Sequence, residues 1–298
     1  MGWSMGETGA TGCHGSRICF SGIDPGRQPW MSEGHAMTSM LVTMHPIWQS
    51  GAIVLAAAII SALVLQVLVH RVLPAALRRE HTELGAAIFS VIGVTYAVLL
   101  AFVAMTAWEQ YTAAQALARH EANLIGSLYG ASHGIAEPAG AAMRADLVAY
   151  LAHVIDVEWP AQIAGHPIPA AEPLLGHLDG MVMALQPNGA GESNVHAVLI
   201  RGLTEVATVR RDRRLATGGT IPDLVWIVLV SGGALMVSFS FILGAPKLSV
   251  HLLMTAALVA SGVLVLLLVL GLSSPFQGEV TIPPDAYRDV LSEIRAAP

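Results

Sequence analysis

Side chains that could do chemistry, histidines and carboxylates above all, gather between residues 108 and 223. His120-Glu121 resembles half of the zinc-binding helix motif of metalloproteases, but position 124 is Leu124, so the second histidine ligand is missing. His153, Asp156 and Glu158 are spaced to share part of one helix face, where they would either hold a divalent cation or form a solvated surface. Of these two interpretations, a solvated face is the default. The sequence also has no phosphate loop, dinucleotide fingerprint or serine elbow. We therefore expect no enzyme activity, no catalytic residue, no cofactor and no metal site.

A basic cluster stands apart from these groups. It reads Arg210-Arg211-Asp212-Arg213-Arg214, a composition that suits either nucleic acid or a membrane surface. The net charge of -6 and the pI near 6 argue against a nucleic-acid partner, because a phosphate backbone requires a concentrated basic face. A hydrophobic segment begins roughly ten residues further on, so we expect a membrane-proximal patch that binds anionic lipid.

The elements that must position these residues are set by long hydrophobic runs. Of the 298 residues, 54% are hydrophobic and 12% are charged, against about 25% charged in soluble proteins. Four runs reach the length that crosses a bilayer, and they form two hairpins, in residues 45–107 and 224–272. The expected spans are residues 51–69, 85–107, 224–244 and 250–272. The expected turns contain Arg71, Pro74, Arg78 and Arg79 in the first hairpin and Pro246-Lys247 in the second.

The composition of the spans limits the class of membrane protein. None of the four contains Asp, Glu, Lys or Arg, whereas proton-coupled pumps and many transporters need an ionisable side chain inside the membrane. His251 falls at a membrane edge, where we expect an interfacial position. A pore lined by backbone and apolar side chains remains compatible with this composition.

The second span carries small residues at helical spacing. They lie on one face, which suits either close packing against another helix or a position around the axis of an oligomer, where this face or the adjoining one would line a pore. The small residues are Ala86, Ser90, Gly93, Ala97, Ala101 and Ala104, and the adjoining face holds Ile92, Tyr96 and Leu99.

Residues 108–223 form a polar domain between the hairpins. Its alanine and leucine spacing predicts only helices: a continuation of the second span to about residue 128, then helices over residues 138–158, 173–185 and 193–215. Trp108 marks the point where the second span leaves the membrane. Glu158-Trp159-Pro160 is predicted to end the second of these helices, because proline cannot continue a helix.

The two ends of the chain differ in character. Residues 1–44 are rich in glycine and contain both cysteines, Cys13 and Cys19; we expect disorder there, and the true start could be a later methionine. Residues 273–298 form a tail in which Pro275-Phe276 stops the fourth span and residues 284–294 form a short amphipathic helix. More arginine near the span ends on the side of the polar domain favours cytoplasmic termini and a cytoplasmic polar domain.

Several pieces of the sequence, in this order, resemble a bacterial family of membrane proteins called the bestrophin-like domain of unknown function. The resemblance covers roughly residues 85 to 290, and at Ser273 the chain departs from an acidic residue that members often carry there. The matching pieces are the run from Phe89 to Phe102, Trp108-Glu109, Tyr111, Glu121-Ala122, Tyr150, Glu158-Trp159-Pro160, Arg211, Arg214-Leu215, Pro222, Trp226 and Pro275-Phe276-Gln277-Gly278.

The resemblance implies an architecture and a function. Bestrophins are pentameric channels, mostly for anions, with four spans in each subunit, a pore lined by the second span and a helical cytoplasmic domain. We therefore expect an all-helical, bestrophin-like, homo-oligomeric ion channel of the bacterial inner membrane, whose partners are lipid, inorganic ions and further copies of itself. The alternative is a non-conducting membrane scaffold or sensor whose helical domain binds a protein partner.

Overall fold

A computed structural model describes residues 47–72, 82–166, 172–217, 221–243, 247–278 and 280–296. Within these ranges the chain is helical and contains no strand, so the predicted fold class is confirmed. The expected disorder of residues 1–44 and the turn residues Pro74, Arg78, Arg79 and Pro246 lie outside the described residues.

Four helices are long and apolar enough to cross a membrane. They are α2 (Ile47–Val72), α4 (Thr82–Ser132), α9 (Asp223–Ile242) and α10 (Leu248–Leu272). Each contains almost all of one predicted span, because an apolar run of this length is a local property of the sequence. The chain is therefore a multi-pass membrane protein.

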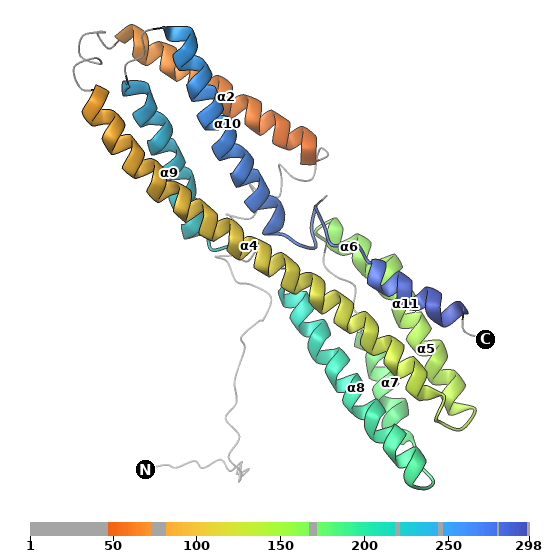
Figure 1. The fold of residues 1–298 in the computed structure, drawn as a ribbon. Coiled ribbons are helices and arrows are strands. Elements are labelled where there is room, and N and C mark those ends of the chain that lie inside the picture. Colours follow the sequence, from red (N-terminus) through yellow and green to blue (C-terminus); the bar gives the residue numbers. More distant parts are fainter. Residues whose placement is uncertain are drawn as a thin grey trace, which may run out of the picture.

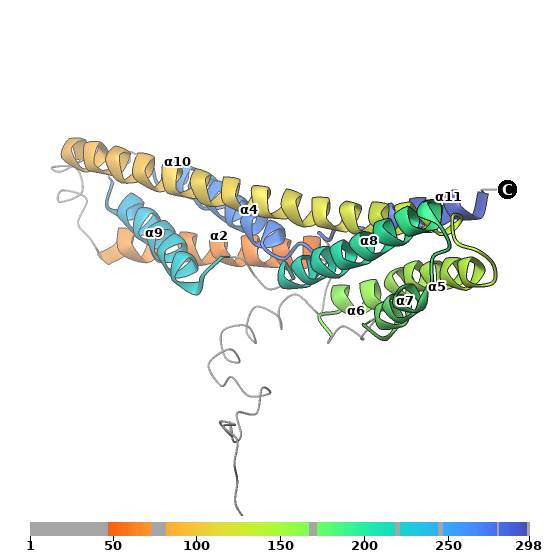
Figure 2. The same ribbon diagram turned by 90° about the horizontal axis from the view of Figure 1, so that it is seen from below.

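The helix α4 joins the two halves of the molecule. Its 51 residues span about 75 Å at the usual helical rise. Figures 1 and 2 show α2, α9 and α10 beside its first half, and the helices of the polar domain beside its second half. The predicted continuation of the second span is thus present and extends to Ser132, four residues further than expected.

The polar domain is built from further helices that pack on α4 and on one another. These are α5 (Ala139–His153), the π-helical turn η1 (Val154–Glu158), α6 (Trp159–Ile163), α7 (Glu172–Ala184) and α8 (Ala190–Leu215). The predicted helix end at Pro160 is wrong. Proline fits near the start of α6 because its missing N–H is not needed there, so the chain stays helical to Ile163.

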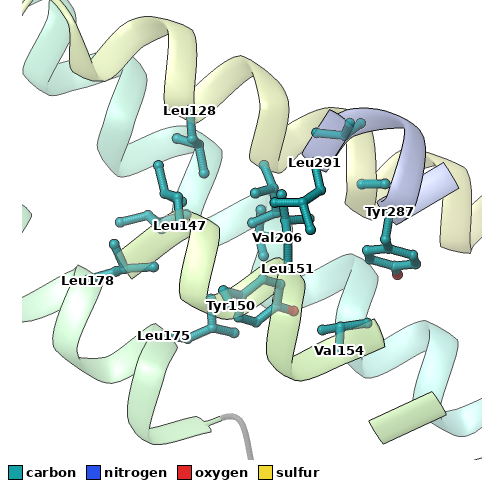
Figure 3. Close-up of a cluster of buried hydrophobic side chains, with 14 of the residues drawn as sticks. Leu128, Leu147, Tyr150, Leu151, Val154, Leu175, Leu178, Val206, Tyr287 and Leu291 are labelled. Carbon is teal, nitrogen blue, oxygen red and sulfur yellow. The ribbon is translucent and has the colours of Figure 1, made fainter. Parts of the chain in front are cut away.

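The C-terminal segment completes this domain instead of standing apart as a tail. Helix α11 (Asp285–Ala296) packs against α4 and α5 through Tyr287, Val290 and Leu291, the apolar side predicted from the sequence. Figure 3 shows Leu291 and Tyr287 in the same cluster as Leu147 of α5 and Leu128 of α4. The main hydrophobic core of the described chain therefore lies in the polar domain.

The membrane half buries much less. Its own clusters are small, one around Ala62, Phe241 and Val259 and one around Ala107, Val269 and Leu272. Large apolar side chains cover the outside of the four long helices, as expected of surfaces that face lipid or other subunits.

Candidate functional site

The small-residue face of α4 is largely uncovered within one subunit. Ala86, Ser90, Ala97 and Ala101 are exposed, and only Gly93 and Ala104 are half-buried. The hydroxyl of Ser90 donates to the carbonyl of Ala86, four residues earlier, so even this polar side chain is satisfied by its own helix. The result is a smooth, uncharged strip along the membrane half of α4.

The adjoining face is used inside the subunit. The Tyr96 hydroxyl donates to the carbonyl oxygen of Leu229 in α9 over 2.9 Å, and Ile92 and Leu99 on the same side are half-buried. The Tyr96 ring fits because α9 has glycine there: a Cβ added at Gly233 would meet the hydroxyl oxygen at 2.8 Å. Of the two faces that the sequence offered, the small-residue face is the more exposed, although a Cβ added at Gly93 would lie 3.2 Å from Met236 of α9.

A second feature lies where α4 enters the polar domain: a buried network of four charged side chains. Glu121 of α4, Glu158 of η1, and Arg210 and Arg213 of α8 have side chains that are 0%, 0%, 3% and 0% exposed. Arg213 Nε lies 2.7 Å from Glu121 Oε2, and its Nη2 lies 3.1 Å from Glu158 Oε2. Arg210 binds Glu158 through both terminal nitrogens, one of them at 3.0 Å. Two positive and two negative charges thus balance inside the protein.

Neutral side chains complete the network. The Tyr150 hydroxyl donates to Glu121 Oε1 over 2.6 Å and accepts from Arg210 Nη1 over 2.9 Å. Arg213 Nη1 donates to the side-chain oxygen of Gln162 over 3.2 Å. The Arg213 guanidinium also lies 5.1 Å from the centre of the Trp159 ring, within range of a cation–π contact. These partners satisfy much of the hydrogen-bonding capacity that burial would otherwise leave unused.

Burial and charge act in opposite directions on the ionisable groups. Burial lowers the pKa of the Arg210 guanidinium, but the hydrogen bond and charge of Glu158 outweigh it and leave that pKa above its ordinary value. Burial, and then the Glu121 charge, raise the pKa values of the Tyr150 and Tyr287 hydroxyls well above 10. The arginines therefore stay charged and the tyrosines neutral in the folded protein.

The prediction that the basic cluster binds lipid is wrong for Arg210 and Arg213, which point into the core. On α8 they continue the buried stripe of Leu199, Leu203 and Val206 at spacings of three and four residues. That spacing was visible in the sequence, and Glu121 likewise follows the apolar spacing of α4. Arg211 is exposed and Arg214 is half-buried, so lipid binding stays a prediction for these two alone.

The two proline-containing motifs meet beside this network. Trp159 Nε1 donates to the carbonyl of Ile282 over 2.8 Å, and the Phe276 ring stands edge-on to the indole at 5.7 Å. Pro275 is buried, while Pro160 is exposed. The turn that carries Phe276 closes at Gly278, whose φ of 78° favours glycine and whose N–H donates to Ile163 over 3.3 Å. Trp108, in contrast, is exposed and stacks on Tyr111.

The described residues contain no group of three or more His, Cys, Asp or Glu side chains able to hold a metal ion. Of the three residues considered for a divalent cation, Glu158 binds Arg210 and Arg213, whereas Asp156 is exposed. His251, which is expected at a membrane edge, has a buried ring whose Nε2 lies 3.0 Å from the carbonyl oxygen of Ser240.

Comparison with solved structures shows a shared fold. A bacterial bestrophin homologue from Klebsiella pneumoniae superposes with a TM-score of 0.59 at 20% identity, covering 80% of this chain and 100% of that one. A single-residue variant of the homologue gives a TM-score of 0.61 at 17% identity, covering 80% and 99%. No curated protein matches the sequence. The sequence model of the Bestrophin-like domain matches residues 56–287, and the chain therefore belongs to the bestrophin-like family.

Proposed function

We propose that this protein is a homo-oligomeric ion channel in which α4 of each copy surrounds a central pore, with its small-residue face toward the axis. The observation that supports the proposal is that two faces of α4 have different surroundings. The side with Tyr96 packs on α9, while Ala86, Ser90, Ala97 and Ala101 remain exposed within one subunit, next to the large apolar side chains Val94 and Val98. Membership of a channel-like family supports the same function.

The chemistry of this face suits a pore without fixed charge. The described part of α4 between Leu84 and Trp108 has no charged side chain, so ions would pass small and apolar groups, and narrow apolar stretches can gate by excluding water. Small side chains also let neighbouring helices come close around an axis. Closed rotational symmetry, five-fold by analogy with bestrophins, would place α4 innermost. Anions are the proposed permeant ions on the same analogy.

The polar domain would form a vestibule on one side of the membrane. An even number of spans places both termini and this domain on the same side, which we propose is the cytoplasmic side of the bacterial inner membrane. Because α4 passes unbroken from the spans into the domain, the buried charge network would hold the vestibule in line with the pore.

Ionic current through planar bilayers tests the proposal. Purified full-length protein in asymmetric potassium chloride is expected to give unitary currents whose reversal potential lies near that of chloride. A reversal potential near that of potassium would contradict the proposal that anions permeate but would support the proposal that the protein is an ion channel. If the well-folded oligomer gives no current over a range of calcium concentrations and pH values, the alternative of a scaffold or sensor whose helical domain binds a protein would be favoured.

Cysteine accessibility tests which face of α4 lines the pore. In a background with Cys13 and Cys19 changed to serine, Ala97→Cys is expected to lose current when a charged, water-soluble thiol reagent is added. Thr95→Cys is the matched control, because the two positions differ by about 3 Å in depth and about 200° around the helix. Block of the Thr95 variant alone would place the pore on the opposite face.

A further inference from the structure

Three polar side chains of α2 and α10 are buried inside the membrane half of the subunit, away from the proposed pore face. Gln66 of α2 is 1% exposed, and Thr255 and His251 of α10 are 2% and 6% exposed. Polar groups inside a membrane need partners, because lipid supplies none. The fold and the charge network described above use none of the three except for the bond between His251 and Ser240.

Helix geometry places Gln66 and Thr255 at one level. Gln66 lies one turn beyond Ala62 on α2, and Ala62 packs in a cluster with Val259 of α10. Leu267 of α10 lies beside Gly51 of α2, so the two helices run antiparallel. One turn further along α2 therefore faces one turn earlier on α10. Thr255 is one turn before Val259 and hence faces Gln66, whereas His251 lies one turn further along. Gln66 lies near the C-terminal end of α2 and Thr255 near the N-terminal end of α10, and Figure 1 shows these helix ends away from the polar domain.

The hydrogen bonds at this level are incomplete. Neither the oxygen nor the nitrogen of the Gln66 amide has a partner among the described residues, and the same holds for the Thr255 hydroxyl. That hydroxyl differs from those of four other helical threonines, which donate to the carbonyl four residues earlier. These are Thr95, Thr106, Thr204 and Thr208. The Thr255 hydroxyl is therefore available for a different partner.

Water is the ligand that fits these groups. The Gln66 amide offers both donor and acceptor atoms, the Thr255 hydroxyl can do either, and the Ser240 carbonyl has a second lone pair beside His251. A buried water needs two to four such partners, about the number present here. A dry site would leave an amide unsatisfied in an apolar bundle, which is among the costliest arrangements in a membrane protein.

We propose that each subunit binds a structural water between the Gln66 amide and the Thr255 hydroxyl, where α2 of the first hairpin meets α10 of the second. The water joins the two hairpins by hydrogen bonds at the end of the bundle farthest from the polar domain. This site is independent of whether the protein conducts ions, since it lies between helices of one subunit.

A double-mutant cycle on the full-length protein in detergent tests the shared site. Gln66→Leu and Thr255→Val are each expected to lower the midpoint of thermal unfolding, and the double variant is expected to fall no further than the worse single one. Thr95→Val is the matched control, with no expected change, because that hydroxyl is exposed and bonds its own helix. An unchanged or higher midpoint for Gln66→Leu, or additive losses, would overturn the proposal.

A high-resolution density map of the unmodified protein supplies a second test that does not depend on the variants folding. The expected result is solvent density within hydrogen-bond distance of both the Gln66 amide and the Thr255 hydroxyl. The proposal fails if the amide instead bonds a protein atom directly, or if the two side chains are too far apart for one water to bridge.

Discussion

Arg213 of α8 and Glu121 of α4 form a fully buried ion pair, with Nε 2.7 Å from Oε2, although the two residues are 92 positions apart in the chain. Such a pair is stable only when further partners satisfy both groups, and here Glu158, Tyr150 and Gln162 do so. The pair fixes α8 against the helix that also crosses the membrane. It therefore ties the register of the polar domain to that of α4.

Removing one member of this pair should strongly destabilise the folded protein. Arg213→Met leaves the carboxylates of Glu121 and Glu158 with a single arginine in a buried site, and we expect a loss of about 3–5 kcal/mol in unfolding free energy. Thermal or denaturant unfolding of the protein in detergent measures it. Arg211→Met, at an exposed position on the same helix, should change stability by less than about 0.5 kcal/mol. Equal effects of the two variants would rule out the buried network as a source of stability.

Tyr96 should behave as a packing residue and not as a pore residue. Tyr96→Phe removes the hydrogen bond to the Leu229 carbonyl and should cost about 0.6 kcal/mol, a typical value between membrane helices. Single-channel conductance and reversal potential should stay unchanged, because the ring remains against Gly232 and Gly233. A changed reversal potential in an equally stable variant would show that the hydroxyl contacts the permeant ion.

Trp159 should be needed for the polar domain to fold. Trp159→Ala deletes the bond to the Ile282 carbonyl and the contacts with Phe276 and Tyr287, and should cost about 3–5 kcal/mol in unfolding free energy. Size-exclusion chromatography and thermal unfolding would show reduced assembly and stability. The exposed Trp108 supplies the control, since Trp108→Ala empties no core. Conduction lost from a fully assembled, equally stable Trp159 variant would instead indicate a direct role in the channel.

The two buried tyrosines should limit stability in alkali. Their pKa values are raised above the ordinary value of 10, so the unfolded chain loses these protons first. The contribution to stability is complete below pH 10 and is lost as the pH rises through the folded-state values. In a series of measurements from pH 8 upward, the midpoint temperature of unfolding should therefore decrease once the pH exceeds about 10. Tyr287→Phe should reduce this fall, and an unaltered fall in this variant would contradict the assignment.

The parts of the structure that were predictable from sequence are those set by local pattern. The four spans follow from apolar length, and α11 follows from the spacing of Tyr287, Val290 and Leu291. The burial of Arg210 and Arg213 was not predicted, because a cluster of four arginines is typical of a protein surface, although both residues continue an apolar stripe. Which carboxylates they meet depends on tertiary packing. The π-helical turn before Trp159 likewise has no local signal that outweighs Pro160.

Two helical glycines should respond in opposite directions to alanine. At Gly202 of α8, a Cβ would lie 2.7 Å from Cδ2 of Leu128, a buried side chain of α4 with little room to move. We expect Gly202→Ala to lower the unfolding free energy by about 1–3 kcal/mol, which exceeds the gain in helix propensity. Gly180 of α7 has no atom within 4 Å of the same position, so Gly180→Ala should raise stability by about 0.5–1 kcal/mol.

Thermal unfolding of the two alanine variants beside the unmodified protein checks this contrast directly. The difference in sign arises only if α4 and α8 approach as closely as Gly202 allows, because the change in side chain and in helix propensity is the same at both positions. A rise in stability at Gly202 would mean that the two helices are further apart.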